Sequence, residues 1–187
     1  MSQRWHARTG HEPIDAMVPA AGHPIGAVGQ GLLAGAIGNA VFTGYQVLEA
    51  KLTGNGGGDE KPPKDWGETP EPAQVGQRIV EGVFEEDVPL EKANTMTNTM
   101  HWLFGTSWGA VYGVYQETFK QPFVSGVALT STVMAFDYTV LPAMKLYEKP
   151  WQYAPSDLAK DYAKHLVYGF SVAAAYSALD RLFASRD

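Results

Sequence analysis

Long uncharged and largely apolar runs alternate with charged connections along this chain. Neither the 24 residues at 25–48 nor the 24 residues at 93–116 include an Asp, Glu, Lys or Arg. Between 123 and 144 the only charged residue is Asp137. A helix of about 24 residues is about 36 Å long, whereas the hydrocarbon layer of a bilayer is about 30 Å thick. The pattern predicts membrane-spanning helices at 25–50, 93–117 and 123–146.

A fourth helix is predicted at 157–183. Residues 165–179 are uncharged, and Pro155-Ser156-Asp157 is a typical helix start with Ser156 as the N-cap. The sequence therefore predicts an all-α, integral membrane four-helix bundle that forms a single domain. The alternative is a soluble four-helix bundle, since the helices are rich in Gly, Ala, Ser and Thr. A soluble helix needs a charged face toward water, and the first two runs have none.

Polar segments precede and separate the first two predicted spans. Residues 1–24 form a polar N-terminal segment, and 53–92 form a long connection rich in Gly and Pro. The connection has ten acidic and four basic residues, a balance equal to the net charge of −6 of the whole chain. Within it a short amphipathic helix is predicted at about 74–87. This helix either lies on the protein's own aqueous face or docks a partner through Val75, Ile79, Val80, Val83 and Phe84.

An internal repeat relates the two halves of the chain. The pattern His-x-x-(Phe/Tyr)-Gly-x-Ser-x-x-Ala-x-Tyr begins at His101 and again, 64 positions later, at His165. A fainter match aligns the first and third spans, with Tyr45 corresponding to Tyr138 at an offset of 93. The repeat predicts two related helical hairpins inserted the same way up. Chance similarity between helices rich in Gly and Ala is the competing explanation.

Small residues recur at the four-residue spacing that lets membrane helices approach closely. They either pack the four helices against one another or present one stripe to another subunit. The predicted helix-packing positions are Gly31, Gly35, Gly38, Gly105, Gly109, Gly113 and Gly169.

Polar residues inside the predicted spans are the candidate site. Asp137 and His101 are expected at similar depth, because both lie eight or nine residues from span ends on the same side. A carboxylate within a membrane costs about 3 kcal/mol and marks either function or a buried partner. Asp137 therefore either bonds His101, Thr or Asn structurally or moves a proton or ion. At the offset of 93 it corresponds to Gly44, so the acid breaks the repeat. The whole predicted cluster is Asp137, His101, Asn39, Thr43, Gln46 and His165.

Composition narrows the range of functions. The chain has no cysteine, which excludes disulfides and thiolate metal sites, and its net charge of −6 disfavours nucleic-acid binding. It has no phosphate loop, nucleophile elbow or zinc-protease motif, so we expect no enzymatic activity and no metal. One cofactor remains as a hypothesis, a haem ligated by His101 and His165 on two helices.

The run Gly31 to Gly38, followed by Gln46, and the stretch from His165 to Tyr176 resemble the YagU-like family of bacterial inner-membrane proteins. The resemblance implies a small multi-span protein of the bacterial inner (cytoplasmic) membrane and transfers no catalytic residue. The long acidic connection departs from it.

Three functions follow as expectations from these features. The first is a non-enzymatic accessory or scaffold subunit that binds other membrane subunits, or further copies of itself, within the lipid bilayer. The second is a small proton- or ion-coupled transporter or channel that uses Asp137 and His101. The third is a haem-binding membrane subunit.

Overall fold

The computed structural model describes residues 24–54 and 63–184. Within these ranges the chain is all-α, with five α-helices and no strand. The predicted segment 1–24, up to residue 23, and positions 55–62 of the predicted connection lie outside the described residues. The helices are α1 (Pro24–Thr53), α2 (Glu71–Ile79), α3 (Ala93–Phe119), α4 (Pro122–Ala143) and α5 (Pro155–Ala184). The short elements are η2 (Trp66–Glu68), η3 (Val80–Phe84, π-helical), η4 (Leu90–Lys92) and η5 (Pro150–Gln152).

Local sequence explains most helix ends. Between α3 and α4, Lys120 adopts a left-handed conformation (φ 55°) and Pro122 occupies the first turn of α4. The amphipathic helix predicted at about 74–87 instead begins at Glu71, because Pro72 suits a first turn. It ends with η3, before the left-handed residue Glu85. The span predicted to reach 146 ends at Ala143, where Pro142 and left-handed Lys145 (φ 57°) stop α4.

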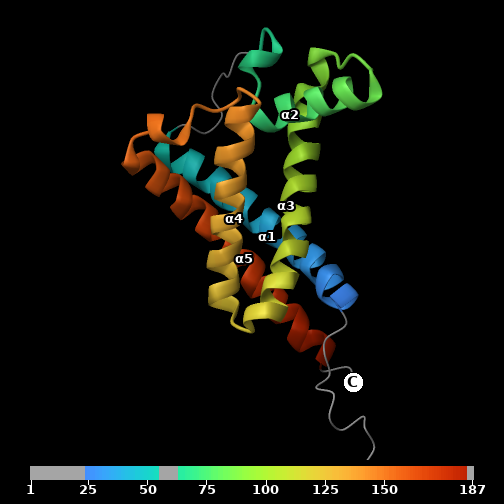
Figure 1. Cartoon of the computed structure of the whole chain (residues 1–187), viewed down its shortest axis with the longest axis vertical. Coiled ribbons are helices and arrows are strands. Elements are labelled where there is room, and N and C mark those ends of the chain that lie inside the picture. The colour runs from blue at the N-terminus through green and yellow to red at the C-terminus, as the bar shows by residue number, and fades with distance from the viewer. Residues whose placement is uncertain (1–23, 55–62, 185–187) are drawn as a thin grey trace, which may run out of the picture.

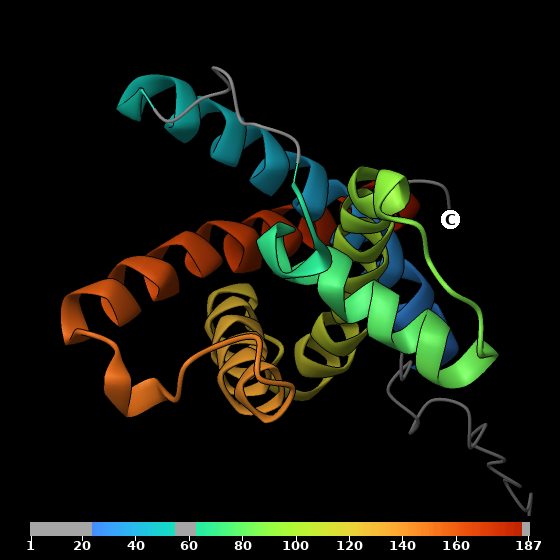
Figure 2. The ribbon, with the colours of Figure 1, turned by 90° about the horizontal axis from the view of Figure 1, so that it is seen from above.

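The four long helices form a ring in which each packs on two neighbours. α1 packs against α3 and α5, and α4 packs against α5 and α3. In Figure 1, α3 and α4 stand upright and are joined at the bottom by their tight turn, while α1 and α5 cross them obliquely. Figure 2 shows α1 and α5 crossing each other and diverging toward their ends, with α3 and α4 closer to end-on. α2 lies against the start of α3.

Glycines bring the helices of each hairpin into backbone contact. A methyl group added at Gly35 would lie 2.8 Å from Gly109 Cα, and one at Gly169 would lie 2.6 Å from Gly126 O. All seven glycines expected at helix interfaces lie against another helix, Gly105 against the side chain of Asn39 and Gly38 against Val172 of α5. Their interfaces lie within the protein, which matches the first of the two roles considered for the glycine stripes.

The two hairpins also make corresponding polar contacts. Asn39 Nδ2 on α1 donates to the carbonyl of His101 on α3 at 3.3 Å. Thr130 Oγ1 on α4 donates to the carbonyl of His165 on α5 at 3.2 Å. Each of these side chains also fills the space above the glycine that follows the histidine by four residues, Gly105 for Asn39 and Gly169 for Thr130.

These contacts indicate an offset of 91 between α1 and α4, since Thr130 follows Asn39 by 91 positions and Gly126 follows Gly35 by the same number. This spacing differs by two residues from the offset of 93 taken from the tyrosines. At an offset of 91 Asp137 would correspond to Gln46 rather than to Gly44.

α2 and η3 cover one end of the ring. Gly76 packs against Met96 and Met100 of α3, and Ala73 beside it is fully buried. Arg78 donates a hydrogen bond to the carbonyl of Met144, at the end of α4. The predicted acidic connection is thus partly folded, and its helix bridges the ends of α3 and α4.

Two helices of the described chain are long and apolar enough to cross a membrane, by length and composition: Gly26–Thr53 and Pro122–Ala143. Only 33% of the apolar window of each is buried inside the protein. On α1 the exposed apolar positions include Leu33, Ile37 and Val41, which are spaced four residues apart. One face of α1 is therefore an exposed apolar stripe.

Candidate functional site: a cavity at the centre of the ring

A cavity of about 520 Å³ lies inside the ring. All five helices contribute to its wall, which combines apolar and aromatic side chains with a few charged ones. Cavities that bind small molecules have volumes of about 300–1,000 Å³ and a similar mixture of side chains. The charged and titratable residues in the wall are Glu71, His101, Asp137, Tyr147, Asp161, Lys164, His165 and Tyr168.

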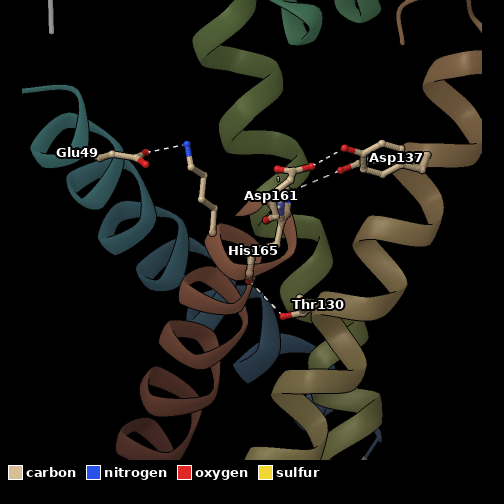
Figure 3. A network of polar contacts seen from close by, with 7 residues as sticks. Glu49, Thr130, Asp137, Asp161 and His165 are labelled. Carbon is tan, nitrogen blue, oxygen red and sulfur yellow. Dashed lines mark hydrogen bonds and ion pairs between the residues drawn. The ribbon is translucent and has the colours of Figure 1, made fainter. Parts of the chain in front are cut away.

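His165 lies between two carboxylates. Its Nδ1 is 2.9 Å from the carbonyl oxygen of Asp161, one turn earlier on α5, and 3.3 Å from Asp161 Oδ1. Its Nε2 faces Asp137 Oδ2 on α4 at 3.8 Å. Figure 3 shows Asp161 and His165 on α5 facing α4, with Thr130 below and Glu49 across on α1. The imidazole therefore joins the two helices of the second hairpin through charged groups.

The hydrogen-bonding capacity of Asp137 and His165 limits what can lie between them. A carbonyl oxygen only accepts, so His165 Nδ1 carries a proton and a neutral ring presents Nε2 as an acceptor. An ionised Asp137 also only accepts. Two acceptors that face each other repel unless a proton or another cation lies with them. The pair therefore favours a proton or another cation between the two side chains.

The neighbouring charged side chains have partners within the protein. Lys164 Nζ is 3.0 Å from Glu49 Oε2, which links α5 to α1. The hydroxyl of Tyr138 donates to Asp161 Oδ2 at 2.9 Å. Asp137, by contrast, is 17% exposed and has no hydrogen bond in the described structure. Of the carboxylates around His165, Asp137 is the one left to bind a ligand.

A tyrosine cluster forms the rim beside these charges. The rings of Tyr138, Tyr147 and Tyr153 lie within 6.4 Å of one another. Burial raises the pKa of the Tyr147 hydroxyl, with nearby carboxylates adding to the shift. Tyr147 thus remains a neutral hydrogen-bonding group at the cavity.

His101 has other partners than expected. Its Nε2 lies 3.1 Å from Thr43 Oγ1, and that hydroxyl also contacts the carbonyl of Asn39 at 2.8 Å. The predicted bond of Asp137 to His101, Thr or Asn is therefore wrong, because Asp137 pairs with His165. The reason is the packing order: α3 packs on α1, so His101 faces α1, whereas α4 packs on α5.

The predicted cluster is thus divided into two groups. Asn39, Thr43 and His101 belong to the first hairpin, and Asp137 and His165 to the second. All of the predicted residues except Thr43 line the cavity, including Gln46. Asp161 and Lys164 also line the cavity but were not singled out from the sequence. The spacing of Asp161 and His165 by four residues on one helix was the available indication.

An aromatic wall lies on the other side of Asp137. Phe136 packs against Phe104 and Trp108 of α3, with ring centroids 5.7 and 5.5 Å apart. The indole Nε1 of Trp108 is buried and has no hydrogen-bond partner in the described structure. An unpaired buried donor is uncommon, since it forfeits the hydrogen bonds it made in water.

The deep end of the cavity is closed. The hydroxyl of Tyr168 on α5 donates to the carbonyl of Gly105 on α3 at 2.5 Å. One turn further, Gly109 meets Gly31 and Gly35 in backbone contact. The end near α2 is more open, with Glu71 exposed and the Lys164 side chain 41% exposed. The cavity is thus closed toward the turn between α3 and α4.

These contacts do not support His101 and His165 as a pair of haem ligands. His101 Nε2 is engaged by Thr43, and both ring nitrogens of His165 face carboxylates or a carbonyl. We expect the purified protein to show no Soret band after growth with added haem precursor. A visible absorption spectrum checks this, and a Soret band that disappears in His101→Ala and His165→Ala variants would restore the hypothesis.

Comparisons with known proteins add no relative. No protein-family model, no curated protein and no solved structure matches this chain. The chemistry of the cavity is accordingly argued from its own residues.

Proposed function

We propose that this chain is a four-span integral membrane protein, built from two repeated hairpins, α1 with α3 and α4 with α5, in the bacterial inner membrane. The exposed apolar positions of α1 and α4 support insertion, since the apolar windows of both are mostly unburied. A soluble bundle would bury that surface. The corresponding contacts of Asn39 and Thr130 support the repeat.

The absence of cysteine gives a direct test of topology. Single cysteines at Glu86 and Lys120 introduce thiols before α3 and after it. In sealed vesicles of one orientation, an impermeant maleimide should label only one of the two positions. Labelling of both without detergent would overturn the spanning of α3.

Within this architecture we propose that the protein is a small proton-coupled transporter whose site is the central cavity. The observation that carries this function is the pair of Asp137 and His165, whose facing atoms favour a bound proton or cation on the wall of the central cavity. Of the two residues expected to act, Asp137 is retained, and His165 replaces His101 as its partner. Rocking of one hairpin against the other is the motion that repeat-built transporters use to expose a central site.

Reconstitution in liposomes tests this function. A pH-sensitive dye inside the vesicles reports proton movement when alkali cations, organic ammonium ions, carboxylates or neutral sugars are added outside. We expect one class to drive protein-dependent proton flux. Flux equal to that of protein-free liposomes for all four classes would overturn the proposal.

An accessory-subunit role is the second candidate, favoured by the apolar surface of η3. Val83 and Phe84 are 69% and 66% exposed, and neighbouring Ile79 is 43% exposed. Val75 and Ile79, two of the predicted docking residues, also line the cavity, and Val80 is only partly exposed. The docking surface for a partner is thus narrower than expected and is centred on Val83 and Phe84.

Replacing apolar side chains of that surface with charged ones tests the docking role. The double substitution Val83→Asp and Phe84→Asp should leave the fold intact and release the protein from any larger native assembly. Size-exclusion chromatography of gently solubilised membranes measures the change. Trp151→Asp, at a side chain that is 77% exposed in η5, is the matched control and should not alter the elution. Elution of the unaltered protein as a free monomer would contradict the accessory role.

A further inference from the structure

Asp137 and the aromatic wall beside it indicate which class of molecule the cavity can bind. We infer that its ligand is a small amphipathic organic cation, with an ammonium group at Asp137 and an apolar body against the aromatic wall. This inference rests on the proposed transporter function and names its substrate class.

The charge balance of the cavity wall favours a cation. Three carboxylates line it, against one ammonium group and two imidazoles, which are uncharged unless protonated. The ammonium group, Lys164, is already paired with Glu49 outside that lining. Asp161 accepts from Tyr138 and contacts His165, whereas Asp137 has only the 3.8 Å approach of His165 Nε2. An arriving ammonium ion takes the place of the proton shared by Asp137 and His165 and donates hydrogen bonds to the carboxylate.

The apolar part of the wall favours an organic cation over a metal ion. Rings of Phe42, Phe104, Trp108, Phe136 and Tyr168 line the same cavity as Asp137. Aromatic faces attract ammonium groups and cover apolar bodies. Calcium and magnesium ions instead take six or more oxygen ligands, and the described residues include no group of three acidic or histidine side chains placed to hold a metal.

Trp108 extends the aromatic wall beside Asp137. Phe136 packs on Trp108 with ring centroids 5.5 Å apart and directly precedes Asp137 in α4, so the aromatic rings and the carboxylate belong to adjoining parts of one wall. The indole N–H is buried, so the ligand meets the ring of Trp108 rather than its nitrogen.

A probe series with one body and three head groups tests the inference without any substitution. The probes are 4-phenylbutylammonium, 4-phenylbutanol and 4-phenylbutanoate, measured by equilibrium dialysis against the full-length protein in nanodiscs and against empty nanodiscs. The ammonium ion should bind about tenfold more tightly than the alcohol, as a charged hydrogen bond predicts. The carboxylate should bind most weakly.

Variants locate the binding. Asp137→Asn should remove the preference for ammonium over alcohol, and Asp157→Asn, at an exposed carboxylate of α5, should retain it. Equal binding of ammonium and alcohol by the unaltered protein, or tighter binding of the carboxylate, would overturn the inference. So would a preference that persists in Asp137→Asn. Proton flux driven by alkali cations alone would overturn the substrate class while leaving the proposed transporter function in place.

Discussion

Asp137→Asn should reduce proton-coupled flux in liposomes to the level of protein-free vesicles. The amide has nearly the shape of the carboxylate but cannot take up a proton, so the pair with His165 no longer binds a positive charge. The fold should survive, because no hydrogen bond to Asp137 is lost and a buried charge is removed. Flux with the pH-sensitive dye and the midpoint of thermal unfolding measure the two effects.

Two control variants test whether the loss of flux depends on where the carboxylate lies or only on the loss of one negative charge. Asp157→Asn makes the same chemical change on the exposed surface of α5 and should transport normally. The double variant Asp137→Gln with Gln46→Glu moves the acid to the corresponding position of the first hairpin. It should stay inactive, because His101, the histidine of that hairpin, is engaged by Thr43. Normal flux in Asp137→Asn would refute the role of the carboxylate.

The sequence predicts the helices better than the contacts between them. An uncharged run at 25–48 places α1 almost correctly, since the absence of charge is a property of the segment itself. Asp137 is identified as a site candidate because it is the only charged residue between 123 and 144. Its partner depends on which helices become neighbours, and depth along the span does not determine that. His101 faces Thr43 on α1 instead.

Asp161 shows the same difficulty in another form. A charged residue near a helix start is usually solvated at the surface, which is the interpretation its position favours. In the structure α4 packs on α5 and brings Tyr138 within 2.9 Å of Asp161 Oδ2. Only the tertiary arrangement turns this residue toward the cavity.

The offset between the hairpins is a further case. Tyrosines and small apolar residues align the first and third spans at 93, whereas the contacts of Asn39 and Thr130 give 91. Residues of similar type recur by composition in membrane helices, but a side chain that fills the space over a glycine is fixed by geometry. An offset of 91 places neutral Gln46 opposite Asp137. The carboxylate therefore remains specific to the second hairpin.

Gly109→Ala should destabilise the protein strongly, although alanine favours helix. The added methyl group would lie 2.6 Å from Gly35 Cα and closer still to the carbonyl of Gly31, both on α1. Backbone cannot move aside as a flexible side chain can, so α1 and α3 must separate. We expect a loss of about 1–3 kcal/mol, typical of overpacking, set against a gain of up to about 1 kcal/mol from helix propensity.

Gly44→Ala is the matched control, since nothing lies within 4 Å of the methyl group it would add on α1. This variant should be neutral or slightly stabilised, because only the helix-propensity gain applies. Thermal unfolding in the same detergent compares the two, and the midpoint of Gly109→Ala should be lower by several degrees. Because Gly105, one turn before Gly109, carries the Tyr168 bond that closes the cavity, separation of α1 and α3 should also loosen that closure. Equal midpoints for the two variants would show that α1 and α3 do not pack through these glycines.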